Sequence, residues 1–291
     1  MKKNEEVRKI RSYNPVWAYI YTLLHPVGAF SLIRYLVIVI YKFFLLQYFE
    51  KFHLYRIPVK NVDHQLDSTV PFREDTEPVY LDFINYWIRP LTMMVRRLGY
   101  FKGIKFSINY LRTISYTYNH AYKVYKKHLT TTRRPKGETR AVRNIQKADP
   151  HYCCVPSLHI AVIILTISFY KKHLDRDDLT EQEKKEWNEE IYSHGVAIAE
   201  SVLYMKQHSV NCIPAAMFMM TMILPDYVER GFIEGFINDL FVNSNDVTDE
   251  NKDKIRRYIL DFYSNLMEQC KNPDMWHTHV LEWIKNYQPS D

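Results

Sequence analysis

The chain has 291 residues and 47% hydrophobic content, which is enough to form a sizeable core in a single domain. It contains only 7 Gly and shows neither a Gly-rich phosphate loop nor alternating strand segments, which argues against a nucleotide-binding fold on a parallel sheet. Lys and Arg outnumber Asp and Glu by 25 to 10 in residues 1–145, but are outnumbered by 23 to 14 in residues 146–291. The two halves therefore carry about +15 and −9, which sum to the net charge of +6.

The basic, aromatic half of the chain admits three interpretations: a surface for anionic lipid, a surface for nucleic acid, or an ordinary solvated face. The sequence has no zinc-finger spacing and no RNA-binding motif, so no nucleic-acid partner is expected. The four cysteines include no CxxC pair, and the first residues lack the pattern of a secretory signal peptide. A reducing, cytoplasmic setting is therefore expected for most of the chain.

Residues 1–77 form a basic and aromatic N-terminal region, within which residues 31–49 (SLIRYLVIVIYKFFLLQYF) are strongly apolar. Arg34 and Lys42 interrupt this segment. The pattern predicts an interfacial helix, a tilted membrane span whose basic side chains reach the surface, or a buried helix. We expect this region to contact a membrane, and the protein to be membrane-associated or otherwise cytoplasmic.

Residues 78–225 are predicted to form a helical core. Apolar spacing predicts helices near residues 80–100, 106–127, 156–173 and 180–205. Thr180 is placed to cap the last of these helices, and residues 130–150 are expected to form a basic loop.

Two stretches of 19 residues, 152–170 and 207–225, contain no Asp, Glu, Lys or Arg. Their length is close to the minimum that spans a bilayer, which makes membrane contact an open possibility. The mean hydropathy of −0.34 argues against a chain made mostly of lipid-facing helix. In residues 226–291 amphipathic segments are expected to pack on the core, separated by a disordered-looking stretch at residues 242–254. The predicted fold class is all-α, a helical bundle.

Three segments carry residue types suited to phosphate chemistry. In chain order they are Lys127-x6-Arg134-Pro135, Pro156-Ser157-Leu158-His159, and Ser201 followed by Lys206 and His208. A phosphoryl group spreads negative charge over three oxygens, so it is held by fixed cations and neutral donors. A histidine near neutral pH can attack phosphorus, and a second one can protonate the departing alkoxide.

These segments resemble the three ordered motifs of the histidine phosphatase superfamily that includes type 2 phosphatidic acid phosphatases and vanadium haloperoxidases. The motifs read Lys-x6-Arg-Pro, Pro-Ser-x-His, and Ser-Arg-x5-His-x3-Asp. The first two match in full, and the third matches at its Ser and its His. The resemblance covers about a third of the chain and implies a helical bundle of the phosphatidic acid phosphatase and haloperoxidase type.

The resemblance also implies residue roles. His208 would be the nucleophile that forms a phosphohistidine, and His159 the general acid, with no metal and no cofactor. The expected phosphate ligands are Lys127, Arg134, Ser157, Ser201 and Lys206. Five of these side chains are expected to converge on one pocket, because a single phosphate contacts them together: Lys127, Arg134, Ser157, His159 and His208. Ser201 could instead pack between helices.

The third motif departs from the family at two positions. Val202 stands where the family has Arg, and Cys212 stands where it has the Asp that orients the nucleophile. Lys206 is a candidate to replace the lost cation, but on a continuous helix it would lie about 200° from His208, so convergence requires a helix end there. Without a carboxylate at position 212, another group such as Asn211 would have to fix the imidazole tautomer.

Three functions are compatible with this pattern. The first is metal-independent hydrolysis or transfer of a phosphate or diphosphate on a lipid-like alcohol. The second is a catalytically silent relative that acts as a membrane-associated binding or scaffold protein, which the two departures favour. The third is a vanadate-dependent haloperoxidase using the same pocket, for which nothing in the sequence indicates halide chemistry.

Overall fold

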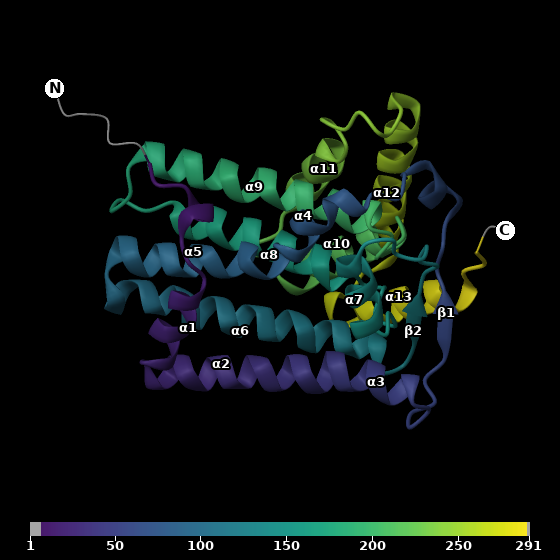
Figure 1. The fold of residues 1–291 in the computed structure, drawn as a ribbon, viewed down its shortest axis with the longest axis horizontal. Helices are drawn as coiled ribbons and strands as arrows, with labels where there is room; N and C mark the ends of the chain where they lie inside the picture. Colours follow the sequence, from purple (N-terminus) through teal and green to yellow (C-terminus); the bar gives the residue numbers. More distant parts are fainter. Residues whose placement is uncertain (1–6, 290–291) are drawn as a thin grey trace.

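The computed structural model describes residues 7–289, and helices dominate this part of the chain, which confirms the predicted all-α fold class. Helices α2, α5, α6, α8 and α9 run roughly along one direction, with α2 at one edge and α9 toward the other, whereas α12 runs across them (Figure 1). The α-helices are α1 (Val16–Leu23), α2 (Pro26–Val39), α3 (Leu46–Lys51), α4 (Glu77–Leu81), α5 (Phe83–Leu98), α6 (Tyr100–Tyr125), α7 (Arg140–Ala148), α8 (Leu158–Leu174), α9 (Glu181–Tyr204), α10 (Cys212–Ile223), α11 (Arg230–Asp239), α12 (Asp249–Gln269) and α13 (Trp276–Asn286).

Shorter elements connect these helices. A π-helical segment, η2 (Ile40–Leu45), joins α2 to α3 without interrupting the helical run. The 3-10 turns are η1 (Ile10–Ser12), η3 (Gln65–Thr69), η4 (Glu74–Thr76) and η5 (Pro273–Met275). Two strands of three residues, β1 (Val59–Asn61) and β2 (Leu129–Thr131), pair in parallel. Thr130 also bridges to Cys153, and this contact fixes the segment that leads into α8.

Helices α8 and α10 supply the centre of the core. Residues 160–165 of α8 and 212–220 of α10 are almost completely buried. These helices contain most of the two uncharged 19-residue stretches, so the apolar composition of both stretches reflects burial inside the protein. Between residues 7 and 289, one helical run, Pro26–Lys51, is long and apolar enough to span a membrane by length and composition.

Two segments expected to lack regular structure are partly helical. Residues 140–148 form α7 inside the predicted basic loop, and residues 249–254 form the first turns of α12. In each case a threonine starts the helix: Thr139 Oγ1 accepts the amide of Val142 at 3.2 Å, and Thr248 Oγ1 accepts that of Asn251 at 3.4 Å. Both predictions were wrong because charge and breaker residues concealed these N-caps.

The three predicted regions of the chain share one hydrophobic core. Ile10, Phe218 and Trp276 belong to the same cluster of buried side chains, although they come from the N-terminal, central and C-terminal regions. Within it, α12 and α13 both contact α10. The C-terminal helices therefore support the helix that follows His208 in the chain.

Candidate functional site

The position of His208 follows from the way α9 ends. The Val202 carbonyl accepts the amides of Gln207 at 2.9 Å and His208 at 3.2 Å, and Lys206 has a left-handed φ of 53°. This arrangement terminates the helix and turns the chain inward. His208 consequently leaves the helix axis and is buried, with 8% of its surface exposed.

Ser157 and His159 lie at the amino end of α8. Ser157 precedes the first helical residue, and its Oγ accepts the amide of Ile160 at 3.4 Å. His159 is the second residue of the helix, close to the N–H groups that have no partner within the helix. Such a helix terminus carries a partial positive charge and favours an anion.

The two histidines of the second and third motifs are in direct contact. His159 Nδ1 lies 3.1 Å from His208 Nε2, and Ser157 Oγ lies 3.2 Å from the same His208 nitrogen. Because a hydrogen bond needs one donor and one acceptor, the imidazoles cannot both be protonated while this contact persists. The structure therefore brings His159, His208 and Ser157 together.

A cavity of about 30 Å³ lies beside these three residues. It is lined by Phe43, Gln47, Tyr80, Asp149, His151, Cys153, Cys154, Leu158, His159, Gln207 and His208. On the α4–α5 side, the rings of Tyr80 and Phe83 lie 5.2 and 4.6 Å from the His159 ring. These aromatic rings restrict the orientation of the imidazole.

Arg134 lies directly behind the cavity wall. Its guanidinium donates to Gln207 Oε1 and to the carbonyl of Asp149, both at 3.2 Å, and lies 3.6 Å from the Asp149 carboxylate. The Arg134 side chain is only 16% exposed. It therefore provides a fixed positive charge next to two residues that line the cavity.

None of the five predicted phosphate ligands lines this cavity: Ser157 contacts His208 and Arg134 contacts two lining residues, whereas the other three lie apart from it. Lys127 is exposed beyond the end of α6, and its charge acts on His277 of α13. Ser201 Oγ donates to the carbonyl of Ile198 at 2.7 Å. Lys206 donates to the carbonyls of Asp67 and Val70, which attaches the end of α9 to η3. Helix α9 does end before His208, as convergence of Lys206 with His208 requires. The Lys206 side chain, however, is bonded to these two carbonyls.

Three residues that the sequence analysis did not select line the same cavity: Asp149, His151 and Cys154. His151 Nδ1 lies 3.5 Å from the Asp149 carboxylate, His151 Nε2 contacts Thr132 Oγ1 at 2.7 Å, and Cys154 Sγ lies 3.6 Å from the same nitrogen. His151 has a left-handed φ of 67°, which is unfavourable for a residue with a side chain. The close spacing Asp-x-His-x-x-Cys directly before the second motif is the signal that could have identified them.

The ionisation of this cluster differs from that of isolated residues. Burial lowers the pKa of His151, but the charge of Cys154 and the hydrogen bond with Asp149 outweigh it and raise the pKa to about 9. Burial raises the pKa of Cys154, but a hydrogen bond with Cys212 and the charge of His151 lower it to about 6. These opposite shifts favour an imidazolium at His151 beside a thiolate at Cys154.

The two motif histidines show the opposite trend to His151. Burial lowers the pKa of His159 to about 4 and lowers the pKa of His208 well below its ordinary value, with a further contribution from the positive charge of His159. His208 is therefore neutral at pH 7, as a nucleophile must be. Its Nδ1 is buried and makes no hydrogen bond to a side chain, while a backbone contact with Cys154 opposes part of the lowering of the pKa.

Cys212, at the position from which a carboxylate would orient the His208 imidazole, and the neighbouring Asn211 make contacts with other groups. Asn211 donates to the carbonyl of Val62 at 3.0 Å and accepts a hydrogen bond from Tyr258. Cys212 is the first residue of α10, and its buried thiol acts on the neighbouring Cys154 thiol. Neither residue accepts a proton from His208 Nδ1.

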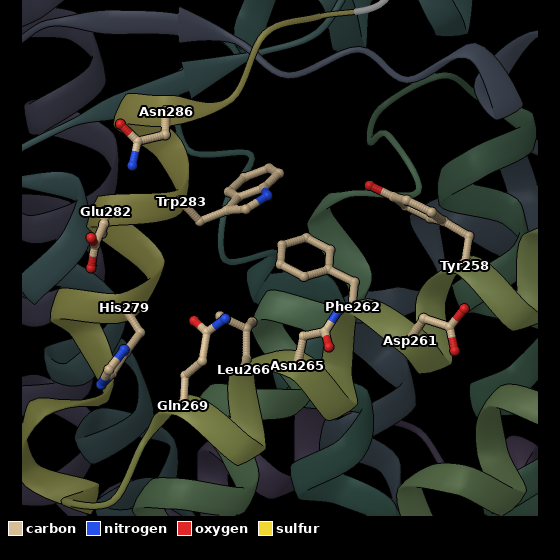
Figure 2. Close-up of a pocket in the computed structure, with 10 residues that line it drawn as sticks. All are labelled: Tyr258, Asp261, Phe262, Asn265, Leu266, Gln269, His279, Glu282, Trp283 and Asn286. Atoms are coloured by element: carbon tan, nitrogen blue, oxygen red, sulfur yellow. The ribbon is translucent and has the colours of Figure 1, made fainter.

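A larger hollow of about 500 Å³ lies between α12 and α13 (Figure 2). Its lining includes the carboxylates of Asp261 and Glu282 and the tilted rings of Phe262 and Trp283, but no Lys or Arg. The small cavity also has a carboxylate and no Lys or Arg in its lining. It is the better candidate because two imidazoles and the amino end of α8 meet there, and because the half-buried Arg134 guanidinium is bonded to its wall.

Comparison with known proteins identifies no relative: no family model matches the chain, and neither a curated protein nor a solved structure matches it. Within residues 7–289, no group of three or more His, Cys, Asp or Glu side chains is arranged to hold a metal ion. The arrangement can bind an anion, and it places a neutral imidazole next to a second one.

The low pKa of His208 predicts a loss of stability in acid. Its contribution is present above the unfolded pKa of about 6.5 and is lost as the pH falls through the folded value, because the unfolded chain binds a proton that the native site excludes. We expect His208→Gln to reduce the pH dependence of the unfolding free energy below pH 6.5 by about 1.4 kcal/mol per pH unit. Urea unfolding at several pH values measures this slope. His53→Asn, at an exposed histidine, should keep the wild-type slope; equal slopes for all three proteins would contradict the assignment.

Proposed function

We propose that this protein transfers or hydrolyses a phosphate or diphosphate group on a lipid-like alcohol, with a histidine nucleophile and without a metal, as phosphatases of the type 2 phosphatidic acid phosphatase superfamily do. The observation that carries the proposal is the contact between His159 and His208 at the amino end of α8. Side chains 49 residues apart that match two separate motifs lie within 3.1 Å of each other.

In the proposed reaction, His208 Nε2 attacks phosphorus while the bond from phosphorus to the alcohol oxygen breaks. His159 is neutral in the free site at pH 7 and takes up a proton when the phosphate anion binds beside it. It gives this proton to the departing oxygen, and then takes one from the water that attacks the phosphohistidine. The amino end of α8 and the Arg134 guanidinium favour the negative charge of the transferred group. A phosphoryl group between the two imidazoles must replace their direct hydrogen bond, so the rings separate when substrate binds.

The lipid-like substrate and the membrane contact remain proposals that rest on the N-terminal region. Phe43 and Gln47, which border the cavity, belong to the one helical run that is apolar and long enough to cross a bilayer. A substrate with an acyl or prenyl chain would therefore find apolar surface next to the phosphate site.

A silent relative that binds a phosphorylated ligand is the second candidate. The His208 Nδ1 favours it, because no side chain among the described residues accepts its proton and so fixes the tautomer that leaves Nε2 free for attack. Anion binding is expected under both functions, whereas turnover is expected under the first alone. The two measurements below separate these functions.

Turnover should depend on the two histidines in different ways. His208→Asn is expected to reduce hydrolysis of phosphate monoesters to the rate in buffer. His159→Asn should slow alkyl esters by about 10²–10⁴-fold and aryl esters far less, because general acid catalysis matters most for basic leaving groups. Steady-state assays with a series of esters measure both effects, with His53→Asn as the control. Wild type and His208→Asn at the same rate would exclude the catalytic assignment.

The protein should take up a proton when it binds an anion. Sulfate keeps its double charge across the neutral range, so a pH dependence of its binding comes from the protein. We expect sulfate to bind more tightly as the pH falls below about 7, because a bound anion favours the protonated form of His159. Calorimetry in buffers of different ionisation enthalpy measures this uptake.

Arg134→Gln should weaken sulfate binding about ten-fold, which corresponds to about 1.4 kcal/mol. Arg133→Gln is the matched control, because Arg133 is the neighbouring arginine and its side chain is 79% exposed. Equal sulfate affinities for the two variants would show that Arg134 does not contribute to the anion site.

A further inference from the structure

One face of the helical run α2–η2–α3 has no partner in the structure. Six apolar side chains at helical spacing form what we call the apolar stripe, and each is between 43% and 67% exposed. They are Val27, Phe30, Ile33, Val37, Ile40 and Phe44. The opposite side of the run, including Leu32 and Tyr35, is buried in the bundle. Figure 1 shows α2 along the edge of the molecule, so this face points outward.

The apolar stripe is long and continuous. From Val27 to Phe44 it extends over about 26 Å of helix. Soluble monomers rarely expose such a contiguous apolar surface, and when they do it marks an interaction site. An occupant that covers this surface is therefore expected.

Positive charge surrounds the apolar stripe. Residues 26–59 contain four Lys and Arg and a single acidic residue, Glu50, whose carboxylate accepts the amide of Ile57 at 2.9 Å. Arg34 lies within the stripe and is exposed. Lys42 and Lys126 lie 5.2 and 5.8 Å from the ring of Tyr122. Basic side chains beside an apolar helix face complement a membrane surface with anionic headgroups.

A second copy of this chain fits the surface less well. A symmetric dimer centred on the apolar stripe would bring Arg34 of one copy close to Arg34 of the other. Like charges at such short distances oppose association. An anionic lipid surface covers the apolar side chains and neutralises the basic ones.

The packing of α2 favours an orientation in the plane of the membrane. Helix α6 lies along α2 (Figure 1) and carries the exposed residues Lys105 and Arg112. If α2 crossed a bilayer while packed on α6, these charges would lie at the depth of the hydrocarbon, which is unfavourable. With the helix in the plane, the apolar stripe enters the bilayer while α6 remains above it.

The same helical run borders the candidate site from its other side. Phe43 and Gln47 line the cavity together with His159 and His208. Gln47 Oε1 accepts the amide of Tyr152 at 2.8 Å, and Gln47 Nε2 is buried without a hydrogen-bond partner. One or two layers of side chains thus separate the apolar stripe from the imidazoles.

We propose that the apolar stripe docks in the plane of an anionic phospholipid bilayer, and that a lipid phosphate reaches His208 past Phe43 and Gln47. The docking is independent of the proposed function, whereas the route for the lipid phosphate rests on it.

Vesicle binding tests the docking surface. Wild type should sediment with vesicles of phosphatidylcholine and phosphatidylserine, and less with phosphatidylcholine alone. The double variant Phe30→Glu/Val37→Glu should bind about ten-fold more weakly or less, because charge replaces the inserted side chains. Val242→Glu is the matched control: Val242 is 51% exposed, on the connection between α11 and α12 at the opposite edge of the molecule (Figure 1). Equal binding by the double variant, or no binding by wild type, would overturn the proposal.

Two further measurements test the orientation and the occupant. Nitroxide labels on Val27→Cys, Val37→Cys and Phe44→Cys should report one common depth in vesicles, since the native cysteines are buried. Label depths that change from one membrane surface through the bilayer centre would show that the helix spans the membrane, and would overturn the in-plane orientation. Light scattering without lipid should show a monomer. A dimer that the double variant abolishes would identify a second copy as the occupant and also overturn the proposal.

Activity separates the two parts of the proposal. With phosphatidic acid in vesicles, the turnover rate of the double variant should be about ten-fold or more below that of wild type. With a soluble phosphate ester, the two proteins should have the same turnover rate. Equal turnover of both proteins on vesicles would overturn the route past Phe43. If wild type binds vesicles but hydrolyses neither substrate, the proposed function fails and the docking surface stands.

Discussion

The hydrogen bond between His159 and His208 is the contact on which the rest of the site depends. It joins the first turn of α8 to the loop after α9, and both positions are set by local backbone chemistry. Ser157 begins one helix by accepting an amide, and the left-handed Lys206 ends the other. Because α8 and α10 are buried at the centre of the core, this geometry is held by the whole bundle.

This contact also defines what the site must do to act on a phosphate. If Ser157 donates to His208 Nε2, the proton of the imidazole resides on Nδ1, where no side chain accepts it and only the backbone of Cys154 acts on the ring. Cys212 carries no carboxylate that could accept this proton. The cluster of Asp149, His151 and Cys154 places an additional ionised pair on the cavity wall. The site therefore has a different charge distribution from the one that the motifs imply.

The sequence predicted the helical class and the meeting of His159 with His208, because apolar periodicity and ordered motifs are local signals. It did not predict that the Lys206 side chain bonds to η3 or that Lys127 is exposed. The direction of the Lys206 side chain depends on where α9 ends, and the exposure of Lys127 depends on which surface the following segment leaves uncovered. The cluster around His151 also escaped notice, since its residues are joined through the three-residue pairing of β1 with β2 and the bridge to Cys153. Strands this short leave no periodic pattern. The uncharged stretches that contain α8 and α10 are ambiguous in the sequence for a different reason: a buried core helix and a membrane span have the same apolar composition.

Detection of a phosphoenzyme tests the central claim most directly. A phosphohistidine is stable in alkali and labile in acid, so the protein can be quenched in alkali during turnover of a phosphate ester and digested for mass spectrometry. The account predicts phosphate on the peptide that contains His208, and no label in His208→Asn. Phosphate on Cys154 during turnover, or turnover without any phosphorylated histidine, would contradict it.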